Sequence, residues 1–126
     1  MTVQLNHTIV WCHDNAGSAA FIARILGRPE PVTFMHFKVV ELDNGASLDF
    51  MDQPGEISRQ HYAFLVSDDA FDAALGRIRA QGLTFWADPA RTQSGEINHH
   101  FGGRGLYFQD PNGHLMEIIT KPYAIR

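Results

Sequence analysis

The chain has 126 residues, of which 44% are hydrophobic and 19% charged, and its net charge is −4 with histidine neutral. This length and composition suit a single domain with a buried core. No basic run or stripe indicates nucleic-acid binding, and no apolar run approaches the roughly 20 residues of a membrane span. The single cysteine, Cys12, excludes an internal disulfide. Because no signal-peptide pattern is visible, we expect a cytoplasmic protein without a membrane or nucleic-acid partner.

The first half of the chain predicts a strand, a helix and two further strands. In chain order these elements are a strand at residues 3–12, a helix at 18–26, and strands at 33–42 and 46–51. The alternation of the first strand puts His7 and Trp11 on one face. The helix carries an apolar stripe at helical spacing and ends at Gly27, a residue suited to the left-handed cap. Asp43-Asn-Gly45 is a tight-turn signal between the last two strands.

The second half repeats this order. It predicts a strand at residues 60–66, a helix with the stripe Phe71, Leu75 and Ile78, a short strand at 83–86, a polar loop at 89–96, a strand or loop at 97–103, and a β-hairpin over 105–120. The hairpin turns at Asp110-Pro-Asn-Gly113, where Asn-Gly supplies residues that tolerate positive φ. Its second strand is apolar apart from one carboxylate, Glu117, and a charge there needs a compensating partner.

The two halves overlay as an internal duplication of roughly 55 residues. The equivalent features are His7 with His61 at the start of each half, the turn ending at Gly45 with the turn ending at Gly113, and Asp49 with Glu117 four residues after these glycines. We therefore expect one domain over 1–126, with module one at about 3–52 and module two at about 60–120.

Two imidazoles and one carboxylate are a common ligand set for a divalent metal with open coordination positions. His7, His61 and Glu117 provide such a set from three predicted strands. Strand side chains point rigidly to one side of a sheet, so the three groups can converge and leave one face for substrate. A bound dication would also neutralise Glu117 in its apolar strand. The sequence therefore predicts a metal centre.

Three segments carry a resemblance to a known family. They are Leu5-Asn-His-Thr-Ile-Val10, His61-Tyr-Ala-Phe-Leu-Val66 and Tyr107-Phe-Gln-Asp-Pro-Asn-Gly-His-Leu-Met-Glu117. The layout, from Leu5 to about Thr120, resembles the vicinal oxygen chelate superfamily: glyoxalase I, extradiol dioxygenases, fosfomycin-resistance thiol transferases and bleomycin-resistance binding proteins. The resemblance implies an α+β fold in which two βαβββ modules form a half-open, U-shaped β-barrel. It also implies that His7, His61 and Glu117 bind the metal, with Fe2+ or Mn2+ favoured and Zn2+ or Ni2+ as alternatives.

The resemblance implies further site residues in the second half. Tyr107, ten residues before Glu117, is expected to hydrogen-bond a substrate oxygen. His99 or His100 is expected to act as acid or base near neutral pH, because the family places a histidine in this region. Arg104 is expected to bind an anionic group of the substrate.

The first half contributes two expected substrate contacts, Trp11 and Asp49. Trp11 shares a face with His7. Asp49 lies where glyoxalase I has a fourth metal ligand near the end of its first module, although Ser47 occupies that place in another alignment. The sequence leaves open whether the site has three ligands or four.

The resemblance favours a metal-dependent enzyme of extradiol-dioxygenase type acting on a small molecule with neighbouring oxygens. The alternatives are a glutathione-dependent thiol transferase of the fosfomycin-resistance type, a glyoxalase-type isomerase that uses Asp49, and a metal-free drug-binding protein. Small two-module members of the family usually dimerise. We therefore expect a homodimer, in which His7 of one chain can face His61 and Glu117 of the other.

Overall fold

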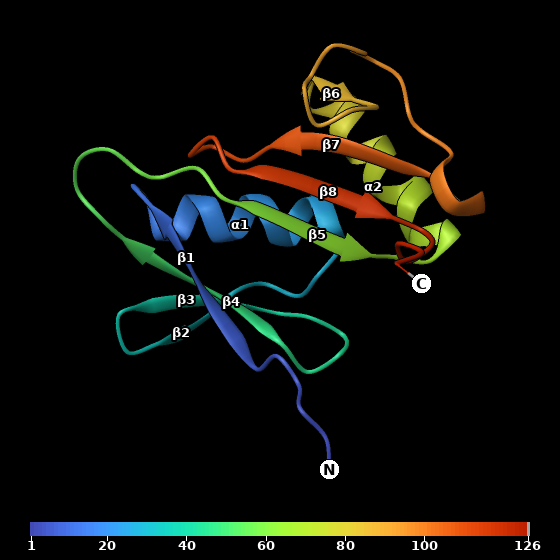
Figure 1. Cartoon of the computed structure of the whole chain (residues 1–126). Helices are drawn as coiled ribbons and strands as arrows, with labels where there is room; N and C mark the ends of the chain where they lie inside the picture. The colour runs from blue at the N-terminus through green and yellow to red at the C-terminus, as the bar shows by residue number, and fades with distance from the viewer. Residues whose placement is uncertain (126) are drawn as a thin grey trace. The chain divides into compact units, whose positions relative to one another are not determined.

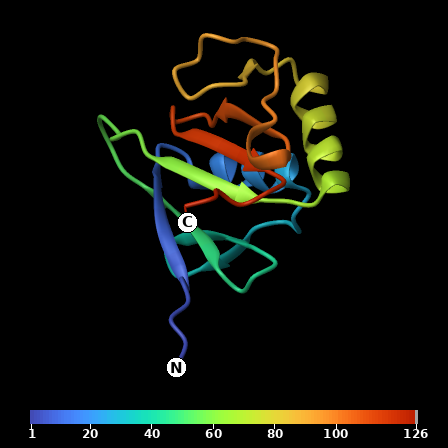
Figure 2. The ribbon, with the colours of Figure 1, turned by 45° about the vertical axis from the view of Figure 1, so that its right-hand side comes forward.

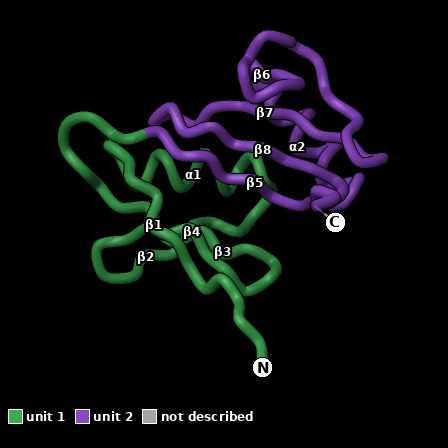
Figure 3. The backbone as a smooth tube through the Cα atoms, in the orientation of Figure 1, with its two compact units in different colours: residues 1–58 green, residues 59–126 purple. Residues whose placement is uncertain are grey.

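The computed structural model of the chain describes residues 1–125 and contains two compact units, with the boundary between Ser58 and Arg59 (Figure 3). Each unit is one four-stranded open sheet with one long helix, and the order of elements along the chain is the same in both (Figure 1). Neither helix within residues 1–125 has the length and apolar character needed to cross a membrane.

The first unit consists of β1 (His7–Cys12), α1 (Asn15–Leu26), β2 (Val32–Phe34), β3 (Phe37–Glu41) and β4 (Ser47–Asp52). Its strand order is β1-β4-β3-β2, with β1 parallel to β4 and the other neighbours antiparallel. Asp14 caps α1 by accepting a hydrogen bond from the Gly17 amide, and Gly27 ends the helix with φ 69°. The helix buries Ile22 and Ile25 and packs against β3 and β4.

The prediction of a single strand at residues 33–42 was wrong, because the chain reverses direction within this segment. β2 and β3 form a tight hairpin in which Phe34 pairs with Phe37, and Met35 takes a positive φ of 55° at the turn. The turn residues Met35 and His36 are not those that usually mark a hairpin, so the sequence carried no signal for it. Lys38 donates a hydrogen bond to the Thr33 hydroxyl across the pair at 2.7 Å.

The second unit consists of β5 (His61–Leu65), α2 (Asp68–Ala80), β6 (Phe85–Trp86), a 3-10 turn, η1 (His100–Gly102), β7 (Gly105–Gln109) and β8 (Leu115–Ile119). Its strand order is β5-β8-β7-β6. The predicted stripe of Phe71, Leu75 and Ile78 on α2 is buried, and the helix lies along one side of this sheet (Figure 2). The region 97–103, predicted as strand or loop, is mostly loop, with one bridge from Asn98 to Gly105 before η1.

The strand register shows that the equivalent strands of the two units pair in the same way. His7 pairs with Ser47 as His61 pairs with Leu115, and both pairings start a parallel ladder. Two residues further along β4 and β8 lie Asp49 and Glu117. The predicted α+β fold of two βαβββ modules is thereby confirmed, while the U-shaped arrangement of the modules stays a prediction.

Candidate functional site

The candidate site of the second unit lies on one face of its sheet. Glu117 pairs with Ala63 of β5 on one side and with Tyr107 of β7 on the other, and His61 lies two residues before Ala63. Because side chains alternate along a strand, these positions place His61, Tyr107 and Glu117 on the same face. The opposite face is apolar and packed in the core, where Phe108, Met116 and Ile118 are fully buried. The sheet thus holds the polar groups on a rigid support.

The turn between β7 and β8 is fixed by a buried carboxylate. Asp110 is only 5% exposed, and its Oδ1 accepts hydrogen bonds from the backbone amides of Asn112 at 2.9 Å and His114 at 2.8 Å. His114 is fully buried, and its Nδ1 accepts a hydrogen bond from the Gln60 amide at 3.0 Å. His114 therefore has a structural role, because it ties the start of β5 to the hairpin that carries Glu117.

Glu117 is almost completely buried, with 1% of its surface exposed. The Tyr123 hydroxyl lies 2.8 Å from Oε1 and 2.7 Å from Oε2 of this carboxylate and donates to it. The Nε2 atom of His61 lies 3.1 Å from Oε1. A tyrosine that donates to the carboxylate and a histidine, both of the same unit, therefore lie against Glu117.

The orientation of His61 suits a cation. Its Nδ1 lies 3.0 Å from the carbonyl oxygen of Leu115. A carbonyl only accepts hydrogen bonds, so Nδ1 carries the hydrogen and a neutral ring presents the lone pair of Nε2 to Glu117. Two acceptor atoms 3.1 Å apart need a proton or a cation between them. Histidines that bind metals are held in the same way, with the second ring nitrogen donating to a backbone carbonyl.

Two tyrosines surround the carboxylate. Tyr107 pairs with Glu117 across β7 and β8, and its ring stacks on that of His61 with centroids 6.0 Å apart. Burial, followed by the hydrogen bond with Tyr123 and the negative charge of Glu117, raises the pKa of Tyr107. Burial and the hydrogen bond to Glu117 likewise raise the pKa of Tyr123. Both hydroxyls therefore keep their protons at neutral pH and act as donors.

These groups border a pocket of about 210 Å3. Its lining consists of Asn98, His100, Phe101, Arg104, Tyr107, Glu117, Ile119, Lys121 and Tyr123. Of the two histidines considered as acid or base, His100 is among these residues and His99 is not. The backbone of Phe101 has a positive φ of 56°, which is strained for an aromatic residue, and strain of this kind is common at functional sites.

Tyr123 is the main site residue that the sequence analysis missed. It lies beyond the last strand, in a stretch with no periodicity that would assign it to an element. Its hydroxyl nevertheless contacts both oxygens of the predicted metal ligand. The only available signal was an aromatic residue six positions after Glu117, which no general rule connects with a site.

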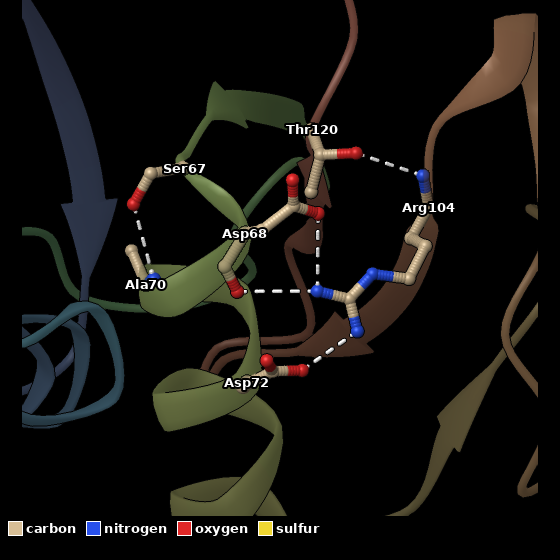
Figure 4. Close-up of polar contacts among 6 residues, drawn as sticks. All are labelled: Ser67, Asp68, Ala70, Asp72, Arg104 and Thr120. Carbon is tan, nitrogen blue, oxygen red and sulfur yellow. Dashed lines mark hydrogen bonds and ion pairs between the residues drawn. The ribbon is translucent and has the colours of Figure 1, made fainter.

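The guanidinium of Arg104 is held by the first turns of α2 (Figure 4). It forms ion pairs with Asp72 at 2.6 Å and Asp68 at 3.2 Å, and its Cζ lies 4.5 Å from the centre of the Phe71 ring. Its backbone amide donates to the Thr120 hydroxyl, and the hydrogen bond with Asp72 is the largest cause that raises its pKa. An anionic substrate group would have to compete with both carboxylates for Arg104.

Arg104→Gln is expected to loosen the contact between α2 and β7 and to lower the urea midpoint of unfolding. Much of this loss should disappear in 1 M NaCl, because salt screens exposed charges and the carboxylate side chains of Asp68 and Asp72 are 75% and 64% exposed. Arg24→Gln, on the exposed side of α1, makes the same charge change and should leave the midpoint in place. Equal effects of the two substitutions would show that the contacts with α2 contribute nothing specific.

The first unit carries the remaining predicted residues on its own sheet. An open groove of about 430 Å3 is lined by Asn6, His7, Ile9, Val32, Phe34, Phe37, Val39, Glu41, Ser47 and Asp49. His7 Nδ1 lies 2.7 Å from the Asn6 side-chain oxygen, and Asp49 accepts a hydrogen bond from the Ser47 hydroxyl at 2.8 Å. Trp11 is partly exposed but is not among the lining residues.

The predicted metal ligands are divided between the two units. His61 and Glu117 come together in the second, and His7 belongs to the first. Within residues 1–125, no group of three or more histidine, cysteine, aspartate or glutamate side chains is gathered closely enough to hold a metal ion. The structure thus provides a two-residue ligand pair, and the three-ligand set remains a prediction.

Comparison with known proteins gives a family and several relatives. The family model described as Glyoxalase/Bleomycin resistance protein/Dioxygenase superfamily matches residues 4–118. The solved structures of oxidase ChaP-H1 and oxidase ChaP-H2 are 54% and 59% identical to this chain. Both have a TM-score of 0.96, and the matches cover 98% of this chain and 99% and 98% of those chains. Glutathione transferase FosA from Serratia marcescens is 32% identical over 73 residues, which are 58% of this chain but only 45% of that protein.

Proposed function

The chain belongs to the Glyoxalase/Bleomycin resistance protein/Dioxygenase superfamily, and from this premise we propose that it is a metal-dependent oxidoreductase acting on a small molecule with two neighbouring oxygens. The observation that carries the proposal is the approach of His61 Nε2 to buried Glu117 Oε1 at 3.1 Å. Oxidation is favoured over the other activities of the family because two oxidases share more than half of the sequence along nearly its whole length.

The chemistry of the donor atoms fits a divalent metal. Glu117 and His61 offer a carboxylate and an oriented imidazole, and His7 of module one would be the third ligand. Imidazole and carboxylate together suit Fe2+ and Mn2+, with Zn2+ and Ni2+ as alternatives. When bound, such a metal supplies Lewis acidity to the substrate oxygens and, in the case of Fe2+, a place for O2.

The side chains around the pocket would bind and orient the substrate. Tyr107 keeps its proton at neutral pH and can therefore donate a hydrogen bond to a substrate oxygen. His100, exposed at the pocket, is the better placed of the two neighbouring histidines to exchange a proton with solvent. The groove of the first unit has apolar walls with His7 and Asp49 among its polar groups, and Trp11 is exposed nearby in sequence. An aromatic ring bearing hydroxyl groups would suit these surfaces.

The test is a comparison of metal-free and Fe2+-loaded protein under anaerobic conditions, followed by addition of air and a panel of catechols and larger aromatic diols. We expect metal analysis to find one bound metal per chain, and an oxygen electrode to record O2 consumption only with the loaded protein and a diol. Failure to retain any of Fe2+, Mn2+, Ni2+ or Zn2+ would contradict the metal site. Turnover of a diol without O2 consumption would contradict the oxidation.

A second candidate is thiol transfer, which is supported by the similarity to glutathione transferase FosA. The match spans less than half of that relative, so it supports this activity less strongly than the full-length matches support oxidation. Glutathione consumption by the Mn2+-loaded protein with a panel of epoxides would favour the transferase.

A glyoxalase-type isomerase would in addition need Asp49 at the metal. A metal-free binding protein would have no evident use for the His61–Glu117 pair.

The predicted homodimer, with a metal site shared between chains, is part of the same proposal. Light scattering over a range of concentrations tests it directly, and a mass of one chain at every concentration would contradict it.

A further inference from the structure

Tyr123 occupies the side of Glu117 that a cation would need. Its hydroxyl is nearly equidistant from the two carboxylate oxygens, at 2.8 and 2.7 Å. A metal that binds a carboxylate through both oxygens makes the same two contacts. The phenol ring of Tyr123 rests near that of Phe101, with centroids 5.4 Å apart, and both residues line the pocket.

Tyr123 takes the position on Glu117 that a cation bound through both oxygens would need. A carboxylate offers about four lone-pair positions on its two oxygens. The single hydroxyl of Tyr123 lies within hydrogen-bond distance of both oxygens, so it occupies the position between them. A cation that uses both oxygens must therefore replace the Tyr123 hydroxyl, because the tyrosine O–H and the metal need the same lone pairs.

The segment that carries Tyr123 is exposed and irregular, so it can move away from Glu117. Residues 121–125 follow the last strand, belong to no helix or strand and are all exposed, and Tyr123 itself is 48% exposed. Few buried contacts hold such a segment, so its displacement costs little compared with moving a strand. His61, Tyr107 and Glu117 sit on paired strands and have no comparable freedom.

We propose that Tyr123 is a gate residue of the Glu117 site: its hydroxyl satisfies the carboxylate while no cation is bound, and cation binding displaces it together with residues 121–125. This inference rests on the proposed function, since it takes Glu117 to be a metal ligand. Tyr123 then lowers the affinity of the site for metal, because the hydrogen bond between Tyr123 and Glu117 must break before the metal can bind both carboxylate oxygens.

The first test is calorimetric titration of metal-free protein with Mn2+. Tyr123→Phe keeps the ring but removes the competing hydroxyl, and we expect it to bind Mn2+ about tenfold more tightly, equivalent to about 1.4 kcal/mol. A change of this size is reasonable for losing a hydrogen bond to a charged group. Tyr62→Phe is the matched control. It also removes a tyrosine hydroxyl, but on the face of β5 that points away from Glu117, and it should leave the affinity for Mn2+ unchanged.

The possible outcomes separate this inference from the proposed function. Unchanged or weaker binding by Tyr123→Phe, with normal binding by the wild type, would overturn the gate and leave the metal site in place. If neither protein binds any of the four candidate metals, the metal site and the gate are both overturned.

A second measurement follows Tyr123 itself. The chain has three tyrosines, so 3-fluorotyrosine labelling gives three fluorine resonances, and the one absent from Tyr123→Phe belongs to Tyr123. On saturation with diamagnetic Zn2+ we expect this resonance to move toward the position seen in urea-unfolded protein, while that of Tyr62 stays. A Tyr123 resonance that does not move at saturation would show that metal and hydroxyl do not compete.

Discussion

Glu117→Gln is expected to weaken Mn2+ and Fe2+ binding by at least about 100-fold while the protein stays folded. Loss of an outer-shell partner of a metal ligand typically costs 10–100-fold in affinity, so loss of the ligand charge should cost no less. Glutamine has nearly the same shape and keeps one oxygen for the Tyr123 hydroxyl, but it cannot neutralise a dication. Calorimetric titration gives the affinity, and circular dichroism with urea unfolding reports on the fold.

The matched control is Glu30→Gln, which makes the same chemical change at an exposed position of the first unit. It should leave metal affinity and stability at their wild-type values. Should Glu117→Gln bind metal as well as the wild type, Glu117 would be excluded as a ligand. Should the glutamine variant fail to fold, Glu117→Leu is the alternative, because an apolar side chain of similar size often replaces a buried charge without loss of stability.

The repeat of the two halves and the hairpin of β7 and β8 were predictable from the sequence because their signals are local. Asn-Gly turns, glycine after each helix and apolar stripes are short-range patterns, and they marked most elements correctly, including α2 and the turn at Asp110. The proximity of His61 and Glu117 followed from overlaying the two halves, and their 3.1 Å contact confirms it within the second unit. The charge of Glu117 in an apolar strand indicated that a partner such as His61 lies nearby.

The features that were missed depend on long-range contacts or on turns without typical residues. The hairpin between β2 and β3 turns at Met35 and His36, neither of which marks a turn. Arg104 pairs with carboxylates more than 30 residues away, so its sequence neighbours gave no hint of that use. Tyr123 reaches Glu117 through the path of an irregular segment, and no periodicity predicts such a path.

Asp110→Ala is expected to lower the free energy of unfolding by about 3 kcal/mol, because it removes hydrogen bonds to a buried, charged acceptor. Without the carboxylate, the amides of Asn112 and His114 lose their acceptor at a turn that water enters poorly. The turn sets the register of β7 and β8, so the placement of Tyr107 opposite Glu117 should suffer too. Urea unfolding measures the first effect, and Mn2+ titration below the unfolding range measures the second.

Asp88→Ala provides a control that separates burial from hydrogen bonding. Asp88 accepts hydrogen bonds from the amides of Thr92 and Gln93 and from the Thr92 hydroxyl. Unlike Asp110, it is only half-buried and lies in an exposed loop. The Thr92 hydroxyl is the main cause that lowers the pKa of Asp88, so its stabilising effect is present at neutral pH and is lost as the pH falls through that lowered pKa. At pH 7, Asp88→Ala should cost clearly less than Asp110→Ala, because water replaces the lost acceptor in the loop. Equal losses would mean that burial adds nothing to the Asp110 turn, and that the position of Glu117 is secured by the strand pairing alone.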